Sequence, residues 1–426
     1  MASHTSRLAL WLGLVLVTLT SGGLVAYSSF FNANSICVAP SKALLCFSKI
    51  PSADDLDSVR IETTLGYLQS MNYDDLGTEI VRVTEKGMFG PGDYLPAHRY
   101  SRRQAWNSDE SLFDLGRGLV NADDFSVFLD RTPVSTERVW SNSDPDVMMG
   151  IIYDPDPVSL SILNVRTLEI VELNRWEEFS RCSIGEGEGN QSLDDRYIVI
   201  VCDDNPGRRT MISYDIEQRI EIGRLEAKPT MNWVSVTPSG KYIVVENNGT
   251  EDLNELEELY RYSPDFSSET LLTNDRNHGD LGIDSNGNDV FVMVSDNRIR
   301  YIEIESGSFV DLAIASKIHR PGHGHVSCRN VKRPGWCYLS ANVAGVVGAF
   351  ELTKDNSVSG KFISLFSTGD SHSPSRFELW GLHGSSYESY ASQPKVSVSP
   401  SGDQLVFSSD WYRSGSVHDY VIRSTQ

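Results

Sequence analysis

The sequence is poor in basic side chains, with 37 Lys and Arg against 58 Asp and Glu among 426 residues, a formal net charge of −21. A surface this acidic repels phosphate, which excludes a nucleic-acid groove and an anionic membrane surface as partners. The chain also lacks the GxSxG, HExxH and GxxxxGKS/T motifs and an EF-hand loop. These absences argue against the hydrolase, zinc-protease, nucleotide-binding and calcium-binding sites that such motifs build.

After its first thirty residues the chain lacks any apolar run long enough to cross a bilayer. At the start, Arg7 precedes an apolar core at 8–19, and small residues follow it. This order predicts a secretory signal peptide over 1–26, followed by an N-terminal extension over 27–59. The alternative is an uncleaved anchor, since residues 8–31 could just span a membrane. Either way we expect a secreted or periplasmic protein.

Cysteine is scarce, and its six copies fall into three near-neighbour pairs. In an oxidising compartment, an even number at short spacing favours disulfides. The pairs are Cys37 with Cys46, Cys182 with Cys202, and Cys328 with Cys337.

The most informative feature is an internal repeat. Seven segments combine an apolar alternating run, a polar turn and a second apolar run, with turns near 110, 145, 195, 240, 287, 335 and 402. A period of roughly 40–50 residues built from short strands is typical of a β-propeller. We therefore predict an all-β fold, a seven-bladed β-propeller over 60–426, in which the segment 77–87 adds a strand that closes the ring. The alternative, one or two β-sandwiches, does not explain seven repeats.

In a propeller, the residues that begin the innermost strands converge on one end of the central channel. Side chains of three kinds occupy these positions and their surroundings: candidate acids and bases, cations, and polar or aromatic groups. We predict a catalytic set of Tyr100, His278, His325 and Arg329, and a substrate-binding set of Arg102, Arg103, Asn190, Trp233, Lys395 and Arg376. Arg376 lies in a long insertion before the seventh turn.

This combination fits an anionic carbohydrate. Arg pairs with carboxylate in a forked geometry. Trp106, Trp140 and Trp233 are candidates for stacking on sugar rings; core packing between blades is the alternative, and it is favoured for Trp106 and Trp140. Tyr, His and Arg without a nucleophile suit β-elimination of a uronate, because a cation neutralises the carboxylate while a base removes the adjacent proton. Hydrolysis instead needs a pair of carboxylates, for which Glu186 and Glu188 stay open, as they do for binding a cation.

The segments YSRRQAWN (from Tyr100), HGDLG (from His278) and HVSCRN with RPGW (from His325) resemble the propeller-fold polysaccharide lyases, which include oligogalacturonate lyase and the secreted ulvan lyases. The resemblance implies a carbon–oxygen lyase that cleaves an ulvan-like, uronate-containing polysaccharide. It also implies that Tyr100, His278, His325 and Arg329 carry the chemistry. The three His and one Gln that hold a metal in oligogalacturonate lyases have no clear counterpart here. The alternative is a non-catalytic propeller that binds carbohydrate or protein.

Some of these lyases hold a structural zinc, and His325, Cys328 and Cys337 have suitable ligand types. A Cys328–Cys337 disulfide competes with that site, and export favours the disulfide. We expect no required cofactor, with structural Zn or Ca as the alternative. We further expect an anionic polysaccharide as partner, no nucleic acid, no membrane contact beyond the N-terminal segment, and a monomer.

Overall fold

The computed structural model describes residues 64–425 with internal gaps, together with the strands β1 (Ile36–Val38) and β2 (Leu45–Phe47). The gaps are 74–75, 93–94, 136, 154–157, 205–207, 250–256, 276–278, 296–297, 315–323, 342–345, 353–376 and 387–388. All elements within the described part are β-strands, and no helix there is long and apolar enough to cross a membrane. The predicted signal peptide lies outside the described residues.

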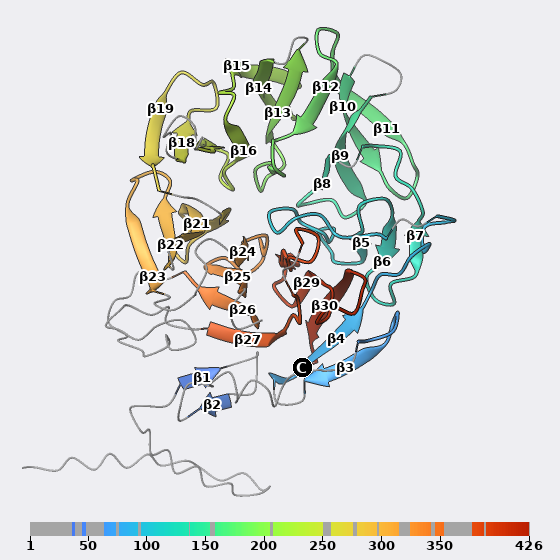
Figure 1. Cartoon of the computed structure of the whole chain (residues 1–426). Helices are drawn as coiled ribbons and strands as arrows, with labels where there is room; N and C mark the ends of the chain where they lie inside the picture. Colours follow the sequence, from blue (N-terminus) through green and yellow to red (C-terminus); the bar gives the residue numbers. More distant parts are fainter. Residues whose placement is uncertain are drawn as a thin grey trace, which may run out of the picture.

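Seven antiparallel sheets form a ring around a central channel, which confirms the seven-bladed β-propeller (Figure 1). The first strand of each blade lies nearest the channel and the later strands lie further out. Blade 1 contains β5 (Leu112–Asp114), β6 (Leu119–Asn121) and β7 (Val127–Leu129). Blade 2 contains β8 (Arg138–Trp140), β9 (Val147–Ile152), β10 (Val158–Asn164) and β11 (Ile170–Trp176). Blade 3 contains β12 (Arg181–Ile184), β13 (Tyr197–Asp204), β14 (Arg208–Asp215) and β15 (Ile220–Glu226).

The remaining four blades continue in chain order around the ring. Their strands are β16 (Met231–Val236), β17 (Ile243–Asn247), β18 (Glu258–Tyr262) and β19 (Glu269–Thr273) in blade 4; β20 (Gly279–Ile283), β21 (Asp289–Ser295), β22 (Arg298–Glu303) and β23 (Phe309–Ile314) in blade 5; β24 (Gly324–Ser327), β25 (Trp336–Ala341), β26 (Val346–Glu351) and β27 (Phe377–Leu382) in blade 6; and β28 (Ser397–Val398), β29 (Gln404–Ser409) and β30 (His418–Ser424) in blade 7, joined by β4 (Thr78–Arg82) and β3 (Ser70–Tyr73).

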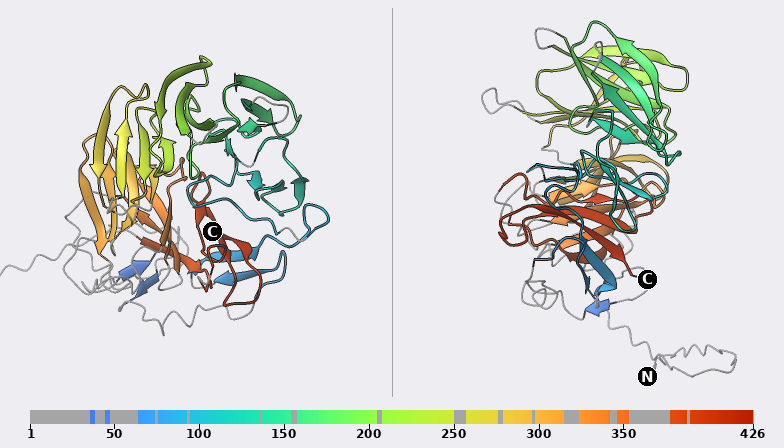
Figure 2. Two further views of the ribbon diagram at one scale, coloured as in Figure 1. Left: turned by 45° about the horizontal axis from the view of Figure 1, so that its top comes forward. Right: turned by 90° about the vertical axis from the view of Figure 1, so that its right-hand side faces the viewer.

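Blade 7 is built from both ends of the propeller sequence. Strand β4 pairs with β30, with Ile80 opposite Ile422 and Val81 opposite Val421. The prediction that the segment 77–87 closes the ring is therefore confirmed. Closure by the chain ends leaves no unpaired sheet edge at the join. The β1–β2 ribbon lies outside the ring and contacts β27 (Figure 2).

The predicted turns join the first strand of each blade to the second. At six of the seven turn positions the backbone φ is positive, between 59° and 84°. Four of these residues are glycines, which adopt this conformation at little cost. Glu110 and Asp195 are the exceptions. Side-chain hydrogen bonds to a neighbouring blade help to offset the cost of their positive φ: Glu110 accepts from Ser401, and Asp195 accepts from Ser141.

The same irregularity recurs in six blades. The register shifts between the third and fourth strands, as at Ser213/Tyr214 in blade 3 and Ile299/Arg300 in blade 5. Blade 1 fits this pattern because the isolated bridge between Trp106 and Phe113 stands in for its first strand. A bulge at this point increases the local twist of the sheet, which lets successive blades lie face to face.

The hydrophobic core is divided among the blade interfaces. Alternate residues of each strand face the preceding or the following blade, so that Val245 packs with blade 3 and Val244 packs with blade 5. Six clusters of buried side chains fill these spaces around the ring. Because the apolar layers lie between the sheets, the innermost strand ends are left free to carry polar side chains into the channel.

Two of the predicted disulfides are present. Cys182 on β12 joins Cys202 on β13, and Cys328 joins Cys337 on β25. Cys37 and Cys46 are opposite each other in the β1–β2 register. The alternative zinc site at His325, Cys328 and Cys337 is wrong for this structure, because both of its sulfur atoms are joined to each other.

We predict that the Cys182→Ser/Cys202→Ser double variant lowers the free energy of unfolding by about 3 kcal/mol, because the bridge restricts the unfolded chain. The Cys328→Ser/Cys337→Ser variant should lose less, since its cysteines are 9 rather than 20 residues apart. Denaturant unfolding of both variants under non-reducing conditions checks the order. Equal stability of the first variant and the wild type would contradict the prediction.

Candidate functional site

The segment 98–106 lies inside the ring and ties the blades together. Arg102 Nε donates to the Gly279 carbonyl of blade 5 at 2.5 Å, and Arg102 Nη2 bonds to Glu246 Oε2 of blade 4 at 2.9 Å. Its guanidinium carbon is 4.6 Å from the centre of the Trp233 ring. Asn190 Nδ2 of blade 3 donates to the Arg102 carbonyl at 2.7 Å. One arginine therefore connects three blades.

The next two residues reach the rest of the ring. Arg103 Nη1 donates to the Arg138 carbonyl of blade 2 at 2.9 Å. Gln104 Nε2 donates to the carbonyls of Arg329 in blade 6 and Val398 in blade 7, each at 3.0 Å. A segment that bonds to blades 2 through 7 must lie on the channel axis. It fills the middle of the channel.

Several predicted substrate-binding residues belong to this filling. Trp233 is fully buried, so the prediction that it stacks on sugars is wrong: its ring is covered by Arg102 and packs against Phe291. Arg102, Arg103 and Asn190 are also buried, with protein partners. The geometry gives them a bracing role, and it lends no support to substrate binding by them.

Tyr100 and His325 come together at the end of the channel where the innermost strands begin. Strand β24 carries His325 at its second residue, and the segment 98–106 carries Tyr100. The two ring centres are 5.1 Å apart, edge to face, at an interplanar angle of 83°. Two candidate acid–base groups from positions 225 apart in the sequence thus meet at this end of the channel, where His325 is 4% exposed and Tyr100 is half-buried. His278 and Arg376 lie outside the described residues.

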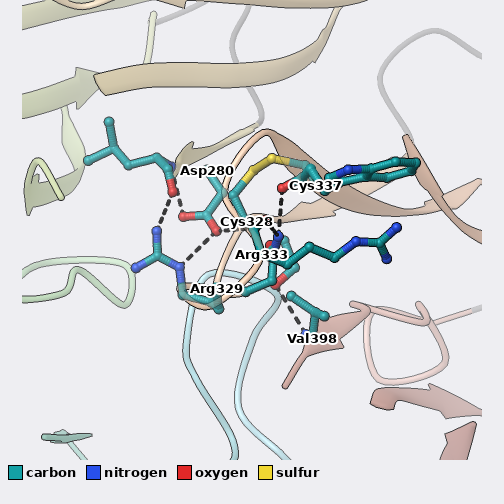
Figure 3. The surroundings of a disulfide bond; sticks show 10 residues. Asp280, Cys328, Arg329, Arg333, Cys337 and Val398 are labelled. Atoms are coloured by element: carbon teal, nitrogen blue, oxygen red, sulfur yellow. Dashed lines mark hydrogen bonds and ion pairs between the residues drawn. A yellow bond between two sulfur atoms is a disulfide. The ribbon is translucent and has the colours of Figure 1, made fainter. Parts of the chain in front are cut away.

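Arg329 faces a different neighbour. Its Nε lies 3.1 Å from Asp280 Oδ2, and Asp280 also accepts from the backbone amides of Cys328 and Leu281. Figure 3 shows the Arg329 side chain pointing toward the Asp280 carboxylate, while Arg333 extends away from it on the other side of the disulfide. Asp280 therefore offsets the charge of Arg329. With Gln191, Leu193 and Val331, Arg329 lines a cavity on the turn side of the channel.

Two other cations stand at the mouth, and neither was predicted to be catalytic. Arg99 directly precedes Tyr100, and its Nε and Nη2 atoms are buried with no hydrogen-bond partner in the described part of the chain. Lys395 precedes β28, and its Nζ lies 3.7 Å from the centre of the Tyr390 ring. Tyr390 is 65% exposed. A carboxylate entering the mouth would find two positive charges and an open aromatic face.

One acidic residue is set among these groups. Glu188 is the common electrostatic neighbour of Tyr100, Tyr390 and Lys395. Burial raises the pKa of Glu188, and the charges of Arg103 and Arg99 only partly offset this. No described residue forms a hydrogen bond with its Oε2 atom. The carboxyl group is therefore more readily protonated than an exposed glutamate.

Close packing explains the glycines around Glu188. A Cβ atom at Gly189 would lie 1.9 Å from the Val234 carbonyl oxygen, and one at Gly187 would lie 2.6 Å from that of Asn232. The GEGEG sequence (185–189) thus forms a blade loop that packs tightly against β16. It holds Glu188 at the mouth with a φ of 73°, and Lys395 has a φ of 47°. Such left-handed conformations in non-glycine residues often cluster at functional sites.

A buried histidine, His98, contacts the backbone of Lys395. His98 Nδ1 lies 2.9 Å from Asp419 Oδ2, and His98 Nε2 lies 2.9 Å from the Lys395 carbonyl oxygen. Burial alone would lower the pKa of His98, but the adjacent Asp419 carboxylate and the Lys395 carbonyl outweigh it, and the pKa is raised.

Sequence reasoning missed Arg99, His98, Asp419 and Glu246. The position of Arg99 could have indicated it, because it directly precedes the predicted catalytic residue Tyr100 in the segment that enters blade 1. Asp419 and Glu246 had none, since acidic residues are common in this chain and these two act through partners 321 and 144 positions away.

No family model and no curated protein matches the chain. Among solved structures it is similar to an oligogalacturonate lyase in complex with manganese, with a TM-score of 0.56 and 12% identity over 84% of this chain and 96% of that one. It is also similar to an oligogalacturonate lyase from Vibrio parahaemolyticus, with a TM-score of 0.54 and 12% identity over 84% and 97%. TolB from Acinetobacter baumannii matches at a TM-score of 0.34 and 13% identity over 59% and 60%, too low to support an argument.

At 12% identity, the two lyases show a shared fold alone. The manganese of the first neighbour has no evident counterpart, because within the described ranges no three His, Cys, Asp or Glu side chains gather in a way that could hold a metal ion. The residues of this chain must therefore indicate its function.

We predict that Arg102→Ala lowers the free energy of unfolding by about 3–5 kcal/mol, because it leaves the Glu246 carboxylate buried without its charge partner. Denaturant unfolding measures the loss. Arg224→Ala is the matched control: Arg224 forms an exposed ion pair with Glu221, and its removal should cost about 1 kcal/mol or less. Similar losses in the two variants would show that Arg102 does not brace the channel.

Proposed function

We propose that this protein is a secreted or periplasmic lyase that cleaves an ulvan-like, uronate-containing polysaccharide by β-elimination at the channel mouth. The observation that carries the proposal is the contact between Tyr100 and His325. Glu188 is the shared electrostatic neighbour that links Tyr100 to Arg99 and Lys395. A cation pair next to a potential acid and a potential base is what elimination requires.

The chemistry assigns a role to each group. The carboxylate of the uronate binds to Arg99 and Lys395, which offsets the charge that develops when the adjacent C5 proton leaves. His325 takes that proton, the C4–O bond breaks, and a C4=C5 double bond forms. Tyr100 donates its proton to the departing oxygen. Burial raises the pKa of Tyr100, which makes its phenolate harder to form. The role of base therefore goes to His325, and the protonated phenol is left for the acid role.

The raised pKa of Glu188 helps an anion to bind. An ionised carboxylate in the mouth would repel the uronate, whereas a protonated one can donate a hydrogen bond to it. Hydrolysis has less support, because it needs two carboxyl groups facing one bond. Glu186 instead lies 3.9 Å from Arg209, a residue of β14 in the same blade.

Two further observations agree with this proposal. The two disulfides are typical of proteins outside the cytoplasm. The two lyases of similar fold act, by name, on oligogalacturonate, which makes that sugar the first comparison substrate beside ulvan.

We predict that wild-type protein incubated with ulvan, glucuronan or oligogalacturonate produces the ultraviolet absorbance of an unsaturated uronate, which only elimination creates. Tyr100→Phe and His325→Gln should each lower this rate by at least about 100-fold, the usual contribution of a general acid or base. Tyr242→Phe is the matched control, since Tyr242 lies at the turn side of blade 4, and it should keep full activity.

Two results would contradict this assignment. Reducing ends without ultraviolet absorbance would indicate hydrolysis. Saturable binding of the saccharide with no cleavage would indicate a non-catalytic propeller that uses the same mouth for recognition.

A further inference from the structure

We propose that His98 is a positioning residue that, as an imidazolium, holds Lys395 in its ligand-binding conformation and makes uronate binding depend on pH. The inference rests on the proposed function in one respect, namely that Lys395 binds the carboxylate. Its structural basis is independent of the reaction.

Oxygen atoms face the ring of His98 from two sides. His98 is 4% exposed, and it lies between Asp419 of β30 and Lys395. Asp419 Oδ2 is 2.9 Å from Nδ1, and the Lys395 carbonyl oxygen is 2.9 Å from Nε2. The backbone amide of His98 also donates to Asp419 Oδ2. Both nitrogens of a buried imidazole therefore face oxygen atoms.

The two hydrogen bonds of the His98 ring fix its protonation state. A carbonyl oxygen accepts hydrogen bonds and does not donate them, and an ionised carboxylate also only accepts. Two such bonds need a hydrogen atom on each ring nitrogen, which is the imidazolium form. Asp419 is held ready to accept, because Ser408 Oγ also donates to it, at 2.8 Å from Oδ1.

The backbone of Lys395 connects His98 to the mouth. Lys395 has a φ of 47°, a conformation that a lysine rarely adopts without support. The bond from His98 Nε2 is received by the carbonyl of this same residue. When the ring loses one proton, the Asp419 carboxylate keeps the remaining hydrogen on Nδ1. Nε2 then no longer donates to the Lys395 carbonyl, and the backbone can relax to an ordinary conformation. The ammonium group would then leave its place over the Tyr390 ring.

The charges around His98 favour the protonated form. Asp419 faces it from β30, and Glu188 acts on it from the blade 3 loop. The Lys395 ammonium opposes protonation, but less strongly than Asp419 favours it. His418, next to Asp419, is directed elsewhere, with Nδ1 bonded to the Thr84 carbonyl.

The protonation of His98 determines the direction of the pH effect. The folded-state pKa of His98 is raised above its ordinary value. The clamp, meaning the hydrogen bond from the His98 imidazolium to the Lys395 carbonyl, is therefore fully present at low pH and is lost as the pH rises through the folded pKa. Affinity for a uronate should fall over the same range.

The test begins with the wild-type protein. Nuclear magnetic resonance should show both ring nitrogens of His98 protonated near pH 6, and the carbonyl signal of Lys395 should titrate with the same midpoint. A neutral ring at that pH, or a Lys395 signal that does not follow it, would overturn the proposal whether or not the protein is a lyase.

Binding of digalacturonate, measured by calorimetry across the same pH range, provides the second arm. We expect the affinity to fall at least about fivefold on deprotonation of His98. Asp419→Asn should move the midpoint to lower pH, while Lys395→Met, which keeps the backbone carbonyl, should weaken binding and remove this pH step. An unchanged step in Lys395→Met would also overturn the proposal. If the wild type does not bind digalacturonate, the functional premise fails, and the resonance arm alone decides whether the clamp exists.

Discussion

The buried pairing of Arg102 with Glu246 is the interaction on which the centre of this propeller depends. Both groups leave water on folding, so they need each other and additional polar partners to offset the cost of desolvation. Those partners come from blades 4 and 5: the Gly279 carbonyl of blade 5, and in blade 4 the Asn232 amide on the other oxygen of Glu246 and the ring of Trp233. A segment that enters the channel therefore fixes the relative placement of the blades around it.

Filling the channel has a consequence for function. With Arg102, Arg103 and Gln104 in the middle, a ligand reaches only the two ends. The end where the innermost strands begin gathers Tyr100, His325 and the cations Arg99 and Lys395, while the turn side holds Arg329 with its charge offset by Asp280. Of the two ends, the mouth is the one that offers positive charge to an anion.

The likeness to oligogalacturonate lyases concerns the scaffold. A propeller places the starts of distant strands at one mouth whatever chemistry is performed there, so shared architecture at 12% identity does not transfer an activity. The proposal of elimination rests instead on the set of side chains at the mouth of this chain. The left-handed backbones of Glu188 and Lys395 there indicate that their positions are held against a conformational cost.

The sequence by itself determined the architecture, because its causes are local. Strand alternation, turn residues with positive φ such as Gly240 and Gly402, and closely spaced cysteines are all visible within a few residues of each other, and repetition made them unambiguous. The tertiary structure alone decided which polar and aromatic residues are accessible to a ligand and which are buried against other blades. Trp233 and Arg102 look the same in a sequence whether they are buried or exposed, and the bond of His98 to Asp419 joins residues 321 positions apart. Burial and long-range pairing are properties of the closed ring, and they exist only once the blades have come together.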